Sequence, residues 1–121
     1  MLSASYTGLK LLLMRHGEAE MGRGMLDHAR RLTAGGAAEV RRVAAELAKG
    51  GHLPKLGVAS DSSRTKDTAS SANLEWPAQA VEWRFEPSLY LAGLTKIQAV
   101  LAKIDAKQYP VVLLLGHNPR S

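Results

Sequence analysis

The amino-acid sequence predicts a three-layer α/β sandwich whose central sheet is mainly parallel. Two runs, residues 9–14 and 111–115, are almost wholly apolar and do not alternate with polar residues. Such runs are typical of central parallel strands that are covered on both faces. Amphipathic stretches with helical spacing lie between the strand-like runs, so that strands and helices alternate along the chain. This order indicates a sheet whose strands are joined by helical crossovers.

Each element has its own local signal. We expect strands at residues 9–14, 56–60, 81–85 and 111–115, and helices at residues 32–51, 64–74 and 94–104. Thr33 can cap the first helix, and Gly50 with Gly51 can end it. Ser62 or Ser63 can cap the second helix, which must stop before Pro77. The third helix carries apolar residues at helical spacing, namely Leu94, Ile97, Val100, Leu101 and Ile104.

The whole chain, residues 1–121, has the length of a single domain. Residues 1–8 are expected to form a short, flexible leader before the first strand. The chain ends at Ser121, directly after the last strand, so the fold is expected to be short at its C-terminus. An apolar strand at that place needs cover on both faces, so we expect either a truncated form or cover by a neighbouring molecule.

Composition narrows the classes of function. The chain has 0 cysteines, which excludes a disulfide framework, a zinc–thiolate site and a thiol nucleophile. The net charge of +5 is spread over helical stretches, and only 5% of residues are aromatic, which argues against nucleic-acid binding. No segment is long and apolar enough to cross a membrane, and no signal peptide is evident, so a cytoplasmic location is the default.

Polar and charged residues follow three of the predicted strands. The first loop gives Arg15-His16-Gly17, the second gives Ser60 to Arg64, and the last gives residues 116–119 with His117. Because ligands bind beyond the carboxyl ends of parallel strands, two histidines and two arginines are expected at one edge of the sheet. Arginine forks match phosphate oxygens, and a neutral imidazole can attack phosphorus. The pattern therefore favours a site for a phosphoryl group.

These motifs resemble those of a known family. LLLMRHGEAE at residues 11–20 is similar to the RHG signature of the histidine phosphatase superfamily, which has the phosphoglycerate mutase-like fold. ASDSSRTKDTA at residues 59–69 resembles the second arginine motif of that family, and LLLGHNP at residues 113–119 resembles its second histidine motif. DHARRLTAGG at residues 27–36 and PSLYLA at residues 87–92 are similar to elements of the SixA-type phosphohistidine phosphatases.

The resemblance covers residues 9–119 and implies a role for each motif residue. His16 would be the nucleophile that is transiently phosphorylated, with Arg15, Arg64 and His117 around the phosphoryl group. Gly17 is free to adopt positive φ. It would let the backbone turn and would leave room for the phosphate. Ser63 and Asn118 would also contact the substrate. The family needs neither a metal ion nor a cofactor for this chemistry.

The leaving group decides between the possible substrates. Glu86 is the nearest candidate for a general acid, with Glu82 and Asp61 as fallbacks, but the SixA-like branch generally lacks this acid. A P–N bond breaks without such help, whereas an alkoxide leaves poorly. We therefore expect a phosphorylated protein carrying phosphohistidine, or another activated phosphate, as substrate. The alternatives are a phosphatase or mutase for small phosphate esters that uses Glu86, and a non-catalytic phosphate-binding module.

Other polar residues are read as structural. His28 and His52 are expected to form hydrogen bonds only. Arg30 and Arg31 could touch phosphate, but a salt bridge with Asp27 or plain solvation is favoured over that role. The sequence leaves the oligomeric state open.

Overall fold

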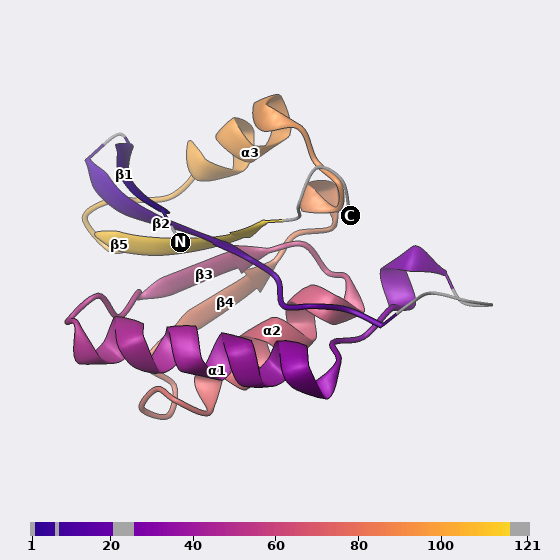
Figure 1. Ribbon diagram of the computed structural model, residues 1–121. Coiled ribbons are helices and arrows are strands. Elements are labelled where there is room, and N and C mark those ends of the chain that lie inside the picture. The colour runs from indigo at the N-terminus through magenta and orange to yellow at the C-terminus, as the bar shows by residue number, and fades with distance from the viewer. Residues whose placement is uncertain (1, 7, 21–25, 117–121) are drawn as a thin grey trace.

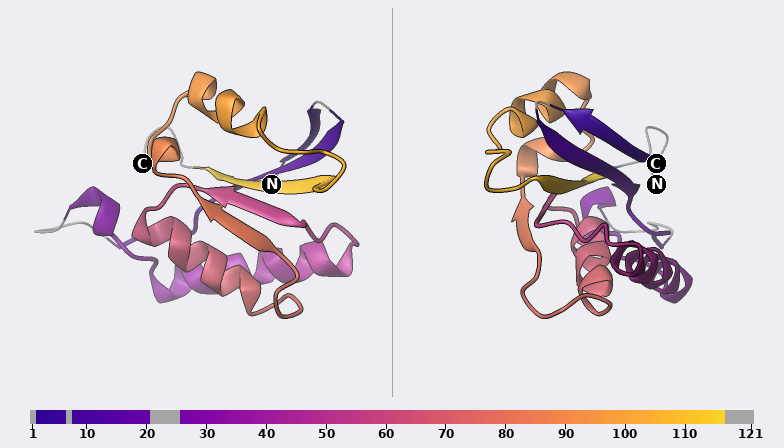
Figure 2. Two further views of the ribbon diagram at one scale, coloured as in Figure 1. Left: turned by 180° about the vertical axis from the view of Figure 1, so that it is seen from behind. Right: turned by 90° about the vertical axis from the view of Figure 1, so that its left-hand side faces the viewer.

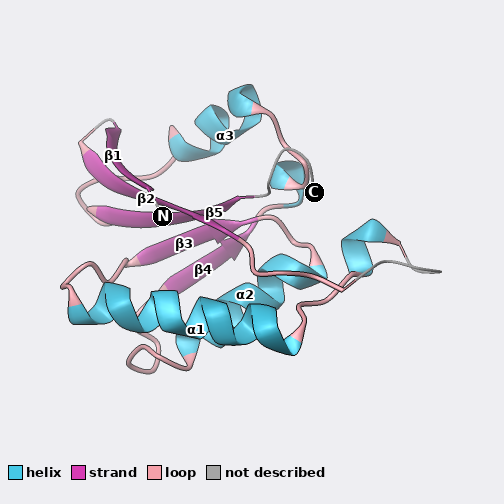
Figure 3. Cartoon of the chain, in the orientation of Figure 1, coloured by secondary structure: helices cyan, strands magenta, loops and turns pink. Residues whose placement is uncertain are grey.

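The computed structural model describes residues 2–6, 8–20 and 26–116, with side chains described from residue 8 onward. Its elements, in chain order, are β1 (Leu2–Tyr6), β2 (Leu9–Arg15), the 3₁₀ turn η1 (Asp27–Ala29), α1 (Ala34–Lys49), β3 (Leu56–Ala59), α2 (Ser63–Asn73), β4 (Glu82–Phe85), the 3₁₀ turn η2 (Pro87–Leu89), α3 (Leu94–Leu101) and β5 (Val111–Gly116). Figure 3 shows how helices and strands alternate along the chain.

The described part of the chain builds one sheet with the strand order β1-β2-β5-β3-β4. Strands β2, β5, β3 and β4 run parallel, as the sequence predicts. Their carboxyl ends therefore lie at the same edge, on the right in Figure 1. The connections run through α1, α2 and α3, which is the crossover that parallel neighbours require.

The expected flexible leader is wrong. Residues Leu2–Tyr6 form the edge strand β1, which pairs with β2 in an antiparallel sense, with Tyr6 opposite Leu9. Gly8 has a φ of 87° in the tight turn between the two strands, a conformation that favours glycine. The leader therefore extends the sheet by a strand.

Helices cover the sheet on both faces, which gives the predicted three layers. Figures 1 and 2 show α1 and α2 against one face and α3 against the other. Alternate residues of β5 point to opposite faces: Leu113 and Leu115 belong to the core under α1 and α2, and Val112 and Leu114 to the core under α3. Because both faces of β5 are covered, its sequence is apolar throughout and does not alternate with polar residues.

The predicted caps are confirmed. The Thr33 hydroxyl accepts a hydrogen bond from the Gly36 N–H at 2.9 Å, and the Ser62 hydroxyl accepts one from the Thr65 N–H at 3.4 Å. Helix α1 ends at Lys49, before Gly50. Helix α3 ends at Leu101, earlier than residue 104, because the next residues turn back toward β5. Within the described residues, no helix is long and apolar enough to cross a membrane.

Candidate active site

The last residues of β2 and β5 lie side by side at the carboxyl edge of the sheet. Arg15, the last residue of β2, is in register with Gly116, the last residue of β5. The His16 N–H donates to the Gly116 carbonyl oxygen at 3.2 Å. His16 therefore stands beside the point where the second histidine motif begins. The predicted site residues His117 and Asn118 lie outside the described residues.

The His16 imidazole is held in one tautomer. Its Nδ1 lies 2.7 Å from the carbonyl oxygen of Gly17. A carbonyl oxygen can only accept a hydrogen bond, so Nδ1 carries the proton. In the neutral ring, the lone pair is then on Nε2, the nitrogen that a nucleophilic role requires.

The surroundings of His16 favour the neutral ring. Burial is the largest cause and lowers the pKa of His16 below its usual value of 6.5. The positive charges of Arg64, Arg30 and Arg15 lower this pKa further, and the bond to Gly17 opposes them. Three guanidiniums are thus close enough to act on this imidazole. Arg15 itself is exposed, and its place at the end of β2 is the predicted one.

A bridge from α2 holds the backbone of Gly17. The Gly17 N–H donates to the Thr68 Oγ1 at 3.1 Å, and the Thr68 hydroxyl donates to the Arg64 carbonyl oxygen at 2.7 Å. Thr68 is fully buried and joins the first loop to the first turns of α2. Sequence reasoning assigned no role to Thr68, although its place four residues after Arg64 was a usable signal.

Gly17 is needed for close packing, and its φ is not positive, so the freedom of glycine to adopt positive φ is not used there. Among the described glycines only Gly8 and Gly51 have positive φ. A Cβ at Gly17 would lie 2.8 Å from the carbonyl oxygen of Gly36 and 2.9 Å from the Val40 side chain. A Cβ at Gly36 would lie 2.4 Å from the carbonyl oxygen of Glu18. The amino end of α1 therefore packs directly on the loop that carries His16.

Arg64 is bound by a carboxylate of the first loop. Its Nη1 donates to the Asp27 carbonyl oxygen at 2.8 Å, and its Nη2 to Asp27 Oδ2 at 3.0 Å. The Arg64 side chain is 0% exposed, so its charge needs an anionic partner. In the structure, Asp27 supplies that partner.

The segment around η1 is clamped to α2 and to the turn before it. His28 Nε2 lies 2.8 Å from Asp61 Oδ1, and the Arg31 guanidinium donates to both carboxylate oxygens of Asp67 at 2.8 and 3.0 Å. Arg30 forms the salt bridge with Asp27 that the sequence analysis favours, at 2.9 Å. The structural interpretation of His28 and Arg30 is therefore confirmed.

The remaining candidate residues differ in where they lie relative to the carboxyl edge of the sheet. Ser63 begins α2 and is half-buried. Glu86 follows β4 at the carboxyl edge, and its N–H donates to the Ala59 carbonyl oxygen at 2.7 Å. Glu82 begins β4 at the opposite edge, which excludes it as an acid for this site. The hydrogen bond to His28 lowers the pKa of Asp61, which makes Asp61 a poor proton donor.

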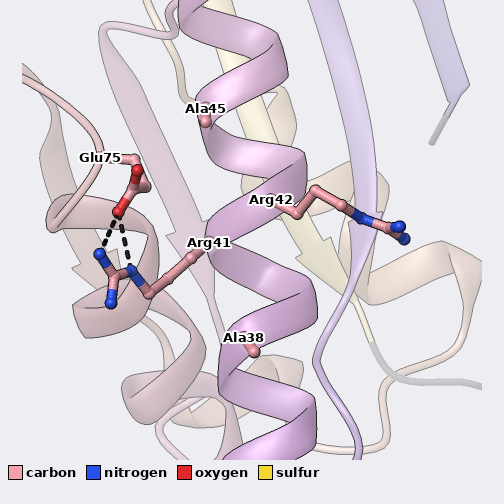
Figure 4. A pocket seen from close by; sticks show the side chains of 5 residues that line it. All are labelled: Ala38, Arg41, Arg42, Ala45 and Glu75. Atoms are coloured by element: carbon pink, nitrogen blue, oxygen red, sulfur yellow. Dashed lines mark hydrogen bonds and ion pairs between the residues drawn. The ribbon is translucent and has the colours of Figure 1, made fainter.

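Neither of two further features offers a site for a ligand. Among the described residues, no group of three or more His, Asp or Glu side chains could hold a metal ion. A surface hollow lies on the outer side of α1, lined by Ala38, Arg41, Arg42, Ala45 and Glu75 (Figure 4). Of its two arginines, Arg41 is paired with Glu75 at 2.7 Å and Arg42 with Glu39. None of the residues that line the hollow is a predicted site residue.

Comparison with known proteins supports the assignment of the fold. A solved structure of the candidate phosphohistidine phosphatase SixA from Agrobacterium tumefaciens superposes with a TM-score of 0.80 at 24% identity, over 90% of this chain and 69% of that one. The corresponding structure from Nakamurella multipartitia gives a TM-score of 0.74 at 32% identity, over 90% and 59%.

A curated relative is also similar in sequence. An uncharacterized chloroplastic protein of Arabidopsis thaliana is 29% identical over 117 residues, which cover 90% of this chain. The chain spans 54% of the length of that relative. The family model described as histidine phosphatase superfamily, branch 1, matches residues 11–90, from the start of the RHG motif through Tyr90. With the motif residues at the expected strand ends, this match places the chain in the histidine phosphatase superfamily.

Proposed function

We propose that this chain is a metal-independent phosphatase that works through a phosphohistidine intermediate on His16. The observation that carries the proposal is the His16 ring itself. Its Nδ1–H is held by the Gly17 carbonyl oxygen, and its pKa is lowered by burial and by nearby guanidiniums. These conditions leave Nε2 as a neutral nucleophile in a cationic environment that attracts a phosphoryl group.

The proposed reaction has two steps. Nε2 attacks phosphorus, a P–N bond forms, and the bond from phosphorus to the leaving group breaks, with the electron pair going to the leaving atom. Water then attacks the phosphorus of phospho-His16, which releases inorganic phosphate and returns the lone pair to Nε2. Arg15 and Arg64 would neutralise the phosphoryl oxygens, and His117 would donate a hydrogen bond to one of them.

Phosphohistidine on a protein is the substrate that we favour. Its imidazole leaving group departs readily without a strong proton donor. The lowered pKa of Asp61 removes one candidate for such a donor. The 32% identity to the candidate phosphohistidine phosphatase of Nakamurella multipartitia supports the same substrate class. A cytoplasmic location remains a prediction from the sequence.

A second function is favoured by the position of Glu86. This residue follows β4 at the same sheet edge as His16, and its backbone is anchored to Ala59. A carboxylic acid there would protonate an alkoxide, and the chain would then act on small phosphate esters.

Trapping of the intermediate tests the proposed function. The protein is incubated with ³²P-labelled phosphohistidine peptide, quenched in base, and digested to locate the label by mass spectrometry. We expect label on His16 in the wild type and none in His16→Ala. His52→Ala is the matched control, because His52 is exposed and its side chain bonds only to Lys10 among the described residues. Label on another residue, or unchanged turnover in His16→Ala, would overturn the proposal.

A further inference from the structure

The Asp27 carboxylate joins three segments of the chain around Arg64. It accepts from Arg64 Nη2 at 3.0 Å and from Arg30 Nη1 at 2.9 Å, and the Tyr90 hydroxyl donates to its Oδ2. The Asp27 backbone oxygen also accepts from Arg64 Nη1. Asp27, a residue of η1, thus binds Arg64 of α2, Arg30 of its own loop and Tyr90, which follows η2.

The bound guanidinium has little freedom to turn. Two of its nitrogens donate to Asp27 in a paired arrangement, and its Cζ lies 5.7 Å from the centre of the Tyr90 ring. The Tyr90 hydroxyl bonds to Asp27, so the ring and the carboxylate hold the same cation from two directions. Such preorganised donors act on a developing charge without having to reorient.

Asp27 is itself fixed and ionised. The hydrogen bond from Tyr90, followed by those from Arg30 and Arg64, lowers the pKa of Asp27 to about 2. The carboxylate therefore carries its charge throughout the neutral range and is no proton donor there. Asp27 can therefore contribute to a reaction only through its negative charge and through the side chains that it holds in position.

The contacts of Asp27 differ from those of the neighbouring salt bridge between Arg31 and Asp67. Arg31 and Asp67 also join the first loop to α2, with a bidentate salt bridge of 2.8 and 3.0 Å. Arg31, however, is exposed, and it is absent from the charges that lower the pKa of His16. Arg64 and Arg30, the two cations that Asp27 binds, both act on His16. Asp67 holds the loop through an exposed arginine, whereas Asp27 binds two of the three cations that act on His16.

We propose that Asp27 is a positioning residue that holds the Arg64 guanidinium in the orientation from which it binds the phosphoryl group. The proposal rests on the proposed function, since it gives Asp27 a task in a phosphate pocket. It predicts that loss of the carboxylate harms the transition state more than the ground state. Removing a negative charge near an anion site does not weaken the attraction for phosphate, whereas a misplaced donor slows the chemistry.

The kinetic test compares Asp27→Asn with the matched variant Asp67→Asn. With an activated aryl phosphate, we expect Asp27→Asn to lower kcat by about 10–100-fold, while the inhibition constant of inorganic phosphate stays equal or falls. Asp67→Asn should keep the wild-type kcat. An unchanged kcat in Asp27→Asn, or an equal loss in both variants, would overturn the proposal.

A second readout does not depend on turnover. Arginine side-chain ¹⁵N–¹H spectra, with the Arg64 signals assigned by their loss in Arg64→Lys, report rotation of the guanidinium. We expect separate Arg64 Nη signals in the wild type and in Asp67→Asn, and averaged signals in Asp27→Asn. Unaltered Arg64 signals in Asp27→Asn would refute the positioning role even if the chain proved inactive, in which case the proposed function would fail separately.

Tyr90→Phe covers the case in which Asp27→Asn does not fold. It keeps the ring beside Arg64 and removes the hydroxyl, which bonds to Asp27 and also to Arg64. A several-fold loss of kcat with unchanged phosphate inhibition is expected, and a wild-type kcat would count against the proposal.

Discussion

The Thr68 hydroxyl accepts from the Gly17 N–H at 3.1 Å and donates to the Arg64 carbonyl oxygen at 2.7 Å. This single group connects the loop that carries the proposed nucleophile to the helix that carries a proposed phosphate ligand. Both partners are backbone groups, so the connection is independent of which side chains surround it. One buried hydroxyl thereby contributes to the spacing between the two motifs.

Thr68→Val should damage both stability and catalysis. Valine has the same shape but no hydroxyl, so the Gly17 N–H loses its acceptor, which costs about 1–3 kcal/mol when the group is buried. We expect a lower free energy of unfolding in urea and a lower kcat with the aryl phosphate. Thr68→Ser, which keeps the hydroxyl, should retain more of both. A Thr68→Val variant as stable and as active as the wild type would refute the role of the hydroxyl.

Gly36→Ala tests the contact between α1 and the nucleophile loop from outside the site. The new Cβ would lie 2.4 Å from the Glu18 carbonyl oxygen, which is a backbone atom and has no room to yield. We expect a loss of about 1–3 kcal/mol in the free energy of unfolding, which is typical of overpacking. Gly35→Ala is the matched control, because a Cβ there would meet only Thr33 Oγ1 at 3.9 Å. Alanine is the better helix former, so this control should be neutral or slightly stabilising. If both variants melted alike, the close approach would not be the cause.

The fall in kcat/KM on the acid side of the pH–rate profile should have an apparent pKa below 6.5. A neutral imidazole must attack, and burial together with three arginines lowers the pKa of His16 from 6.5. Activity should therefore persist at pH values where an ordinary histidine is protonated. The measurement is kcat/KM of the free enzyme against pH, and an apparent pKa at or above 6.5 would contradict the assignment.

The same shift has a consequence for stability, with a definite sign. Above pH 6.5 the ring is neutral in both the folded and the unfolded chain and contributes nothing. Below pH 6.5 the unfolded chain binds the proton more readily, so stability falls as the pH decreases from 6.5 to the folded pKa and levels off below that pKa. His16→Gln should remove this part of the pH dependence of the urea midpoint.

Local signals in the sequence explain why much of the fold and site could be predicted. The apolar strand 9–14 followed by Arg15 and His16 is recognisable because the buried run and the polar motif are adjacent in the chain. The caps Thr33 and Ser62 are equally local, since each accepts from an N–H three residues later.

What the sequence could not provide depends on contacts between distant residues. Asp27 and Arg64 are 37 positions apart, and only the folded loop shows that one neutralises the other. The strand β1 has few residues of high strand propensity, and its pairing with β2 defines it. Gly17 signals a special backbone in the sequence, but the reason, the packing of α1, is a tertiary contact.

Glu86→Gln separates the two enzymatic functions. If the substrate is a labile phosphate, the amide should support the same turnover as the acid, because the leaving group needs no strong proton donor. If the chain hydrolyses alkyl phosphate esters, loss of the acid should slow that hydrolysis by roughly 10²–10⁴-fold. Glu82→Gln is the matched control, since this residue starts the same strand β4 at the opposite edge of the sheet. We expect unchanged turnover of phosphohistidine peptide in both variants. A large loss confined to Glu86→Gln, on an ester that the wild type cleaves, would transfer the assignment to an ester phosphatase, because Glu86 would then be the proton donor that the leaving alkoxide requires.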